Sequence, residues 1–304
     1  KLFRIFCSYL SLILFGSVLT GATVNPFGPP FPESIEAVAI PPTRAENPYV
    51  ATANEIFRWD DNQQLWQEIY SPPWNGVRIL ALGTYYKSSK VIYAVHSSGI
   101  SRSGDGGLTW SESVPIGFDG SVGEFHIKVD PNERKHAVIA SKNKLWETTD
   151  YGASFQAMQI DDRFGDIKAL EFLPGRDSAS LILVQEEGIT LHEGESLYAL
   201  NTWTSEESIE SMAIHPVEPI AILRLFSGKH RLIYLQQGDQ LKTRILPVNV
   251  STDQIQLVAA GSSSLWAASG DSLNLLSLTG DSTKSFTVAE LSTSPDAIFL
   301  HPRK

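Results

Sequence analysis

The chain has 304 residues, of which 42% are apolar and 19% are charged, with one cysteine and a formal net charge of −10. The apolar fraction is enough for an ordinary core, and closed β architectures of this length form a single domain. The acidic balance argues against a nucleic-acid partner, which requires a basic face.

The N-terminal segment combines a basic start with a long apolar run. Lys1 and Arg4 are followed by an uncharged apolar stretch that ends in small residues near Ala22. This arrangement is typical of a secretory signal cleaved after Ala22, but a run of about 20 residues is also long enough to span a bilayer. We therefore expect residues 1–24 to be a signal peptide or an N-terminal membrane anchor, with residues 5–24 forming an apolar helix.

Both alternatives place the rest of the chain on the far side of a membrane, because the basic start stays on the cytoplasmic side. The only cysteine, Cys7, lies inside the apolar run, so the exported part has no disulfide. This fits a bacterial periplasm or a thylakoid-type lumen. Residues 25–34 hold four prolines and are expected to form a semi-rigid extended linker.

An alternating apolar run that ends in proline or glycine recurs seven times after the linker. The terminal residues of successive runs are separated by 42, 48, 43, 42, 45 and 41 residues. A nearly fixed period of this length indicates a repeat architecture. The runs occupy residues 35–41, 77–83, 125–131, 167–174, 209–216, 255–261 and 297–302.

Every run except the last is followed by further short segments rich in Val, Ile, Tyr and Phe, separated by turn residues, which is the pattern of strands and turns. Such repeats form blades of four strands. The sequence therefore predicts an all-β fold, a β-propeller of six four-stranded blades over residues 35–304, in which residues 297–302 form an unpartnered seventh first strand. Seven blades is the alternative, although residues 24–34 are too rich in proline to supply further strands.

Two segments 45 residues apart share the pattern Ser/Thr-x-Asp-x-Gly-x-Ser/Thr-aromatic. A hydroxyl and a carboxylate beside a glycine form a hairpin turn that hydrogen-bonds its own backbone, and the glycine can take positive φ. The aromatic residue is expected to pack on the adjacent sheet. The patterned residues are Ser103, Asp105, Gly107 and Trp110 in the first segment and Thr148, Asp150, Gly152 and Phe155 in the second. A weaker copy keeps Asp61 and Trp66 but has Gln63 in place of the glycine.

The pattern resembles the Asp-box, or BNR, repeat of β-propellers such as sialidases, sortilin-like receptors and photosystem II assembly factors of the Ycf48/Hcf136 kind. Residues 100–107 and 145–152 look like the corresponding strings of the Ycf48/Hcf136 factors. The resemblance implies that the boxes are structural turns on the outer rim of the blades. The arginine cluster found on one face of that family cannot be assigned in this chain.

The search for catalytic residues gives only weak candidates. Sialidases share an Arg-Ile-Pro motif, and the nearest string here, Arg244-Ile-Leu-Pro247, lies too late and carries an extra leucine. Glu36, Glu171 and Glu210 lie on first strands, which line a propeller channel, and a glycosidase needs two facing carboxylates. The seven histidines lack metal-ligand spacing, and no glycine-rich phosphate loop opens a helix, so no metal or cofactor is expected.

The sequence thus favours a non-catalytic, exported, protein-binding scaffold. It would act as an assembly factor or accessory subunit of a membrane complex, similar to Ycf48, with another protein as partner and membrane contact through residues 5–24 if that segment is retained. The expected location is periplasmic or lumenal. The alternative is a sialidase-like glycoside hydrolase or a carbohydrate-binding propeller.

Overall fold

The structure is a computed structural model that describes residues 4–7, 35–39, 48–60, 62–73, 76–85, 88–117, 124–173 and 179–202, and strands between residues 208 and 300. In residues 4–7 and from residue 201 onward, only the backbone is described. This part of the chain contains strands β1 to β25 and one short 3-10 helix, η1. It divides into two compact units, the first with β2 to β13 and the second with β1 and β14 to β25.

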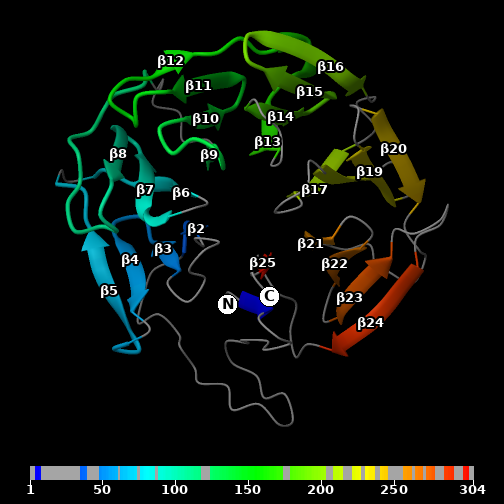
Figure 1. The fold of residues 1–304 in the computed structure, drawn as a ribbon, viewed down its shortest axis with the longest axis horizontal. Coiled ribbons are helices and arrows are strands. Elements are labelled where there is room, and N and C mark those ends of the chain that lie inside the picture. Colours follow the sequence, from blue (N-terminus) through cyan, green and yellow to red (C-terminus); the bar gives the residue numbers. More distant parts are fainter. Residues whose placement is uncertain are drawn as a thin grey trace. The chain divides into compact units, whose positions relative to one another are not determined.

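The first unit consists of sheets whose strands follow one another as antiparallel neighbours (Figure 1). Their orders are β2-β3-β4-β5, β6-β7-β8 and β9-β10-β11-β12, after which η1 and β13 complete the unit. The bounds are β2 Ala37–Ala39, β3 Tyr49–Ala51, β4 Ile56–Asp60, β5 Leu65–Tyr70, β6 Ile79–Tyr85, β7 Ser88–His96, β8 Gly99–Ser103, β9 Phe125–Val129, β10 Ala137–Ser141, β11 Lys144–Thr148, β12 Gln156–Ala157, η1 Asp162–Phe164 and β13 Ile167–Phe172.

The second unit repeats the same plan. Antiparallel β14-β15-β16 is followed by the four-stranded sheets β17-β18-β19-β20 and β21-β22-β23-β24. Successive antiparallel sheets of this kind are the blades of a β-propeller, so the predicted all-β propeller fold is confirmed. The bounds are β14 Ser180–Gln185, β15 Gly188–Glu193, β16 Ser196–Thr202, β17 Ser208–Ile214, β18 Ala221–Phe226, β19 His230–Gln236, β20 Gln240–Ile245, β21 Gln256–Gly261, β22 Ser264–Ser269, β23 Ser272–Ser277 and β24 Lys284–Glu290.

The strand expected to be unpartnered at the end of the repeats has a partner in the structure. β25 (Ala297–Leu300) pairs in parallel with β1 (Arg4–Cys7), forming a two-stranded sheet. β1 lies where the expected N-terminal helix would begin, and its isoleucine and phenylalanine suit a strand as well as an apolar helix. Residues 8–34, which hold the rest of that helix and the proline-rich linker, lie outside the described residues.

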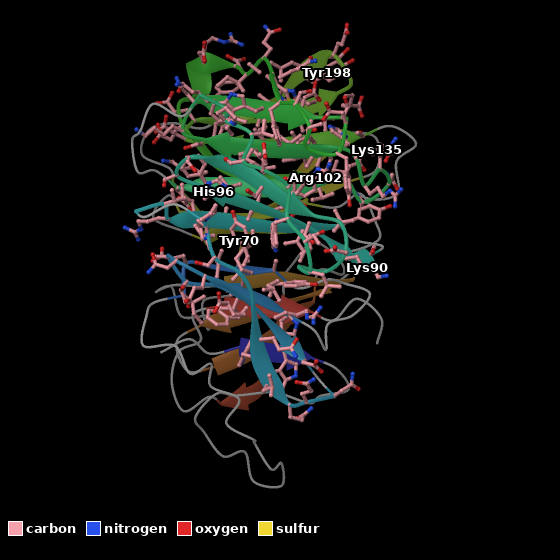
Figure 2. The ribbon with its side chains drawn as sticks, turned by 90° about the vertical axis from the view of Figure 1, so that its left-hand side faces the viewer. Tyr70, Lys90, His96, Arg102, Lys135 and Tyr198 are labelled. Atoms are coloured by element: carbon pink, nitrogen blue, oxygen red, sulfur yellow. The ribbon has the colours of Figure 1, made fainter. Side chains whose placement is uncertain are left out.

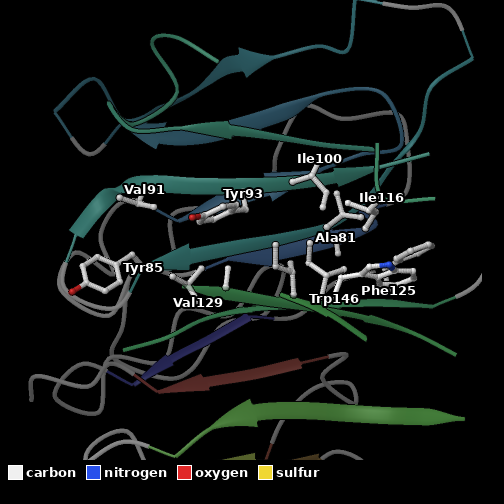
Figure 3. Close-up of a cluster of buried hydrophobic side chains, with 13 residues drawn as sticks. Ala81, Tyr85, Val91, Tyr93, Ile100, Ile116, Phe125, Val129 and Trp146 are labelled. Carbon is white, nitrogen blue, oxygen red and sulfur yellow. The ribbon is translucent and has the colours of Figure 1, made fainter. Parts of the chain in front are cut away.

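Side chains of β7 alternate between two hydrophobic clusters in the first unit. Val91, Tyr93 and Val95 belong to the cluster between the second and third sheets, which Figure 3 shows. Ile92 and Ala94 point the other way, into the cluster between the first and second sheets. Because successive side chains of a strand point to opposite faces, a strand between two sheets must be apolar throughout.

The two patterned turns each connect the third strand of a sheet to the segment after it, and they have matching hydrogen bonds. Asp105 Oδ1 accepts from Ser103 Oγ at 2.8 Å and from the Thr109 backbone N–H at 2.9 Å. Asp105 Oδ2 accepts from Thr109 Oγ1 at 2.6 Å, and the Gly107 N–H donates to Ser103 Oγ at 2.8 Å. The carboxylate and the buried hydroxyl together accept hydrogen bonds from the backbone N–H groups of the turn.

The second turn reproduces this geometry with other side chains. Thr148 replaces the serine, and its hydroxyl donates to Asp150 Oδ1 and accepts from the Gly152 N–H, both at 2.8 Å. Asp150 Oδ2 accepts from Ser154 Oγ at 2.6 Å. Gly106, Gly107, Tyr151 and Gly152 all have positive φ.

Each turn is also fastened to the preceding sheet. The Trp110 indole N–H donates to the backbone oxygen of Ile69, in β5, at 2.9 Å. Arg58, in β4, donates to the backbone oxygen of Gly106 at 3.1 Å. One repeat later, the Arg102 guanidinium lies over the Tyr151 ring, 4.3 Å from its centroid. An arginine of one sheet therefore contacts the patterned turn of the next.

The weaker copy of the pattern has a carboxylate at its turn as well. Asp61 lies outside the described residues, and the carboxylate that caps this turn is Asp60, which accepts from the backbone N–H groups of Asn62 and Gln63 at 2.9 and 3.1 Å. Trp66 packs edge-to-face on Trp59 within its own sheet, with ring centroids 5.5 Å apart. The aromatic residue after this turn thus contacts its own sheet, whereas Trp110 is bonded to the preceding one.

Replacing Gly107 with alanine is expected to destabilise the first unit through two effects. Its φ of +93° is costly for alanine, and the new Cβ would lie 2.6 Å from Ile69 Cδ1. Gly117→Ala is the matched control, because Gly117 has a φ of +68° with open space around it. Urea denaturation should show a loss of about 1–2 kcal/mol for the control and about 1–3 kcal/mol more for Gly107→Ala. Equal losses would refute the steric part of this explanation.

The patterned carboxylates are expected to make stability depend on pH in the acid range. Hydrogen bonds from Thr109 and Ser103 lower the pKa of Asp105 to about 2, and those from Ser154 and Thr148 do the same for Asp150. Because the folded pKa lies below the ordinary value of 3.8, this stabilisation is complete above pH 4 and is lost as the pH falls toward 2. Urea denaturation across this window should give a shallower pH slope for the double variant Asp105→Asn/Asp150→Asn, and an unchanged slope would contradict the assignment.

Candidate functional site

The structure places two of the three candidate channel carboxylates in ion pairs. Glu36, just before β2, lies 3.4 Å from a guanidinium nitrogen of Arg78, just before β6. Glu171, in β13, pairs with Lys128 in β9. Glu210 lies in β17, where only the backbone is described. Each ion pair joins two neighbouring sheets, at or just before their first strands.

A groove of about 930 Å³ lies in the first unit, where the end of β5 meets the segment after the first patterned turn. We call it the Tyr70–Trp110 groove. Most of its surface is apolar, and its single charged side chain is a carboxylate, Glu112. The lining residues are Tyr70, Ser71, Pro73, Val77, Ser98, Ser101, Trp110, Ser111, Glu112, Ser113 and Pro115.

The wall of the groove is a fixed pair of aromatic rings. Trp110 packs on Tyr70 with ring centroids 4.4 Å apart and an interplanar angle of 37°. The indole N–H is already bonded to Ile69, so the ring cannot turn without losing that hydrogen bond. Pro73 and Pro115 add two exposed, rigid apolar surfaces at the rim. This wall is preorganised for an apolar ligand group.

The floor of the groove is a chain of hydrogen bonds between three buried side chains and one exposed serine. The Tyr70 hydroxyl donates to Ser101 Oγ at 3.1 Å, and Ser101 Oγ lies 3.1 Å from His96 Nε2. The other ring nitrogen, Nδ1, lies 2.9 Å from Ser98 Oγ. Figure 2 labels Tyr70 and His96, which come from neighbouring sheets and meet through this serine.

Burial sets the protonation states of the His96 and Tyr70 side chains. His96 is fully buried, which lowers its pKa to about 4, and burial also raises the pKa of the Tyr70 hydroxyl. The imidazole is therefore neutral at physiological pH and has one donor and one acceptor nitrogen. The Tyr70 hydroxyl donates to Ser101 Oγ, and each ring nitrogen of His96 lies within hydrogen-bond distance of one serine hydroxyl.

The Ser101–His96 pair lacks the features of a catalytic dyad. Ser101 is 1% exposed and is covered by the Tyr70 hydroxyl. The second ring nitrogen of the histidine meets a serine hydroxyl rather than an orienting carboxylate. The arrangement holds a polar floor in place without exposing a nucleophile.

A half-buried histidine cluster lies away from the groove. His136 Nδ1 is 3.0 Å from Asp130 Oδ2, and its Nε2 is 3.5 Å from Glu147 Oε2. The Phe172 ring meets the imidazole edge-to-face at 5.1 Å. Within the described residues, no group of three or more His, Cys, Asp or Glu side chains is arranged to hold a metal ion.

The sequence did not reveal the groove. Trp110 was identified only as a turn aromatic, and Tyr70, His96, Ser101 and Glu112 were not singled out. Tyr70 and Ser101 are 31 positions apart, and no short pattern links them. The one available signal was the repeat itself, because it places the end of one sheet beside the turn of the next.

Comparison with known proteins supports the fold. No protein-family model and no curated protein matches this chain. Among solved structures, it is similar to YCF48 bound to a D1 peptide, with a TM-score of 0.59, 17% identity, and coverage of 84% of this chain and 83% of that chain. YCF48 from Cyanidioschyzon merolae gives a TM-score of 0.61 and 13% identity over 87% of this chain and 88% of that one. The WD40 repeats of RRP9 give a TM-score of 0.64 and 10% identity over 89% of this chain and 85% of that one.

These similarities are of fold only, because identities this low do not carry a function. Among the residues that the structure describes, no helix is long and apolar enough to cross a bilayer.

His96 is expected to lower the stability of the protein as the pH falls from about 6.5 to about 4. The unfolded chain binds a proton in this range that the buried imidazole cannot take up. Replacing His96 with glutamine should reduce the slope of unfolding free energy against pH by up to about 1.4 kcal/mol per pH unit.

The measurement is urea denaturation at several pH values, in which the slope is read independently of any overall loss of stability. His192, whose pKa burial also lowers to about 4, is the matched second site. His192→Gln should remove a similar part of the slope. If His96→Gln leaves the slope unchanged, the imidazole is not held neutral by burial.

Proposed function

We propose that this chain is a non-catalytic scaffold that binds another protein, and that the Tyr70–Trp110 groove receives a segment of that partner. The observation that carries the proposal is the groove itself: a mostly apolar surface of about 930 Å³ with two fixed aromatic rings and two exposed prolines. Ligand sites are typically concave and apolar with a few polar groups that orient the ligand. The serine hydroxyls and Glu112 would serve that purpose here.

The stability of the groove supports a binding role. The buried polar groups of Tyr70, Ser101 and His96 are hydrogen-bonded to one another, so a ligand does not have to supply partners for them. Its aromatic wall is held by the hydrogen bond from Trp110 to the first sheet. Binding of a partner would therefore cost little free energy for reorganisation of the site, which favours affinity.

The fold similarity is consistent with this role. One of the similar structures is a YCF48 protein bound to a D1 peptide, so a propeller of similar fold does bind a peptide. For this chain, peptide binding and the Asp-box character of the two patterned turns are parts of the proposal. The matching hydrogen bonds of Asp105 and Asp150 support the Asp-box assignment.

The glycoside hydrolase alternative is weaker. A glycosidase needs two carboxylates that converge on one sugar. Glu36 and Glu171 are each paired with a basic side chain of a neighbouring strand instead. The Tyr70–Trp110 groove is lined by a single carboxylate, Glu112.

Export and attachment to a membrane complex belong to the same proposal. They rest on the basic start and apolar run of residues 1–24, and on the absence of cysteine after Cys7. Intact-mass measurement of the protein from its native source distinguishes a retained anchor from cleavage. A species that starts at Thr23 would rule out the anchor.

A photo-reactive residue in place of Pro115 is expected to cross-link a partner protein. Pro115 is exposed at the groove rim, so its replacement leaves the packed core intact. The full chain would be expressed in its native host, irradiated and purified, and the cross-linked peptide identified by mass spectrometry. The same probe at Lys144, an exposed residue outside the groove, is the control.

The proposal expects one defined partner segment attached at Pro115 and none at Lys144. Replacing Trp110 with alanine should abolish the product in protein that still purifies folded. Recovery of only the uncross-linked chain, or equal products from both positions, would reject the groove as a protein-binding site.

A further inference from the structure

The chemistry of the Tyr70–Trp110 groove indicates which kind of segment it binds, and this inference rests on the proposed function. Three properties of the groove bear on it: the use of the neighbouring backbone groups, the shape of the wall and the position of the charge.

The backbone beside the groove is not available for strand addition. The outer edge of β8 is covered by the segment after the patterned turn, since Ile100 and Val114 exchange hydrogen bonds of 3.0 and 2.8 Å. Arg102 uses its backbone oxygen for the Ser111 N–H and its own N–H for Ser111 Oγ. A partner in a β conformation would therefore find no edge of β8 to pair with.

An extended proline-containing segment does not need such an edge. Polyproline II has no internal hydrogen bonds, its carbonyl groups point outward, and grooves lined by aromatic residues recognise it. Trp110 and Tyr70 provide a fixed aromatic surface for a proline ring. Pro73 and Pro115 bound the groove with rigid rims that do not lose entropy on binding.

The floor supplies a hydrogen-bond donor for such a segment. Ser98 Oγ lies 2.9 Å from His96 Nδ1, and a serine hydroxyl carries one donor and two acceptor sites. Ser98 is exposed and lines the groove. Its hydroxyl can donate to a ligand carbonyl, and carbonyl groups are what a proline-rich segment presents in excess because proline has no N–H.

Charge completes the description of the ligand. Glu112 is exposed and is the only ionisable acid or base in the lining apart from the Tyr70 phenol. The chain as a whole carries a formal charge of −10, which favours encounter with a basic segment. We propose that the groove binds an extended, proline-containing segment with a lysine or arginine, its proline ring against Trp110 and its cation beside Glu112.

The test is fluorescence polarisation of the full chain with labelled ten-residue peptides. The reference peptide has alternating alanine and proline with one central lysine. Its matched forms carry glutamate in place of the lysine, or alanine in place of the prolines. A fourth peptide has the sequence of residues 25–34 of this chain, which is rich in proline but has no basic residue.

We expect the lysine peptide to bind most tightly, with a preference over the glutamate form of roughly fivefold. Glu112→Lys should reverse that preference, and Glu68→Lys, at an exposed position of β5 outside the groove, should leave it unchanged. Replacing the prolines with alanine should weaken binding by about tenfold through loss of preorganisation.

The outcomes separate this inference from the proposed function. The ligand assignment would be overturned if the alanine form bound as well as the lysine peptide, or if the peptide 25–34 bound more tightly than it. It would also be overturned by an unchanged charge preference in Glu112→Lys, or by no binding of any peptide at ~1 mM. Cross-linking from Pro115 would in each case still show whether the groove binds a protein. Failure of that cross-linking would reject both.

Discussion

The alternation of β7 between two hydrophobic clusters is the constraint on which the rest of the first unit depends. A strand that gives Tyr93 to one cluster and Ile92 to the other is covered only when a sheet packs on each of its faces. No sheet of this kind can bury its own core alone. Stability therefore requires packing between neighbouring sheets in addition to the hydrogen bonds within them, and the patterned turns with their arginine contacts lie at these junctions.

The groove follows from the same constraint. Where two sheets meet at an angle, their ends separate, and Tyr70 from one sheet and Trp110 from the turn of the next form the wall of the gap. The polar side chains at this junction are too buried to form their hydrogen bonds with water. The hydrogen-bonded chain of Tyr70, Ser101 and His96 meets that requirement within the protein. A binding surface thus arises at a junction that the fold must make in any case.

The sequence predicted what depends on short spacing. The repeat period and the patterned turns around Asp105 and Asp150 are local, and the structure has strands and self-bonded turns at those positions. In the weak copy, Asp60 accepts from the turn backbone, and the neighbouring Asp61, which the sequence favoured, lies outside the described residues. The partner of β25 was missed because β1 lies at the opposite end of the chain, inside a run that reads equally well as an apolar helix.

The groove and the ion pairs could not be predicted for a different reason. Hydrogen bonds between Tyr70 and Ser101, and the pairing of Glu171 with Lys128, join residues more than 30 positions apart. Their contact depends on the angle between sheets rather than on any pattern within one. Two of the carboxylates expected at the first strands, Glu36 and Glu171, form ion pairs with basic side chains that lie on adjacent repeats.

The contacts between sheets have a direction along the chain. Arg58 contacts the turn that holds Gly106, and Arg102 contacts the turn that holds Tyr151, so in both contacts the earlier sheet offers the arginine and the later sheet the turn. During synthesis on a ribosome, each new turn therefore emerges after the surface it docks on has already been made. Folding can advance sheet by sheet behind the growing end of the chain, with each completed sheet serving as the template for the next.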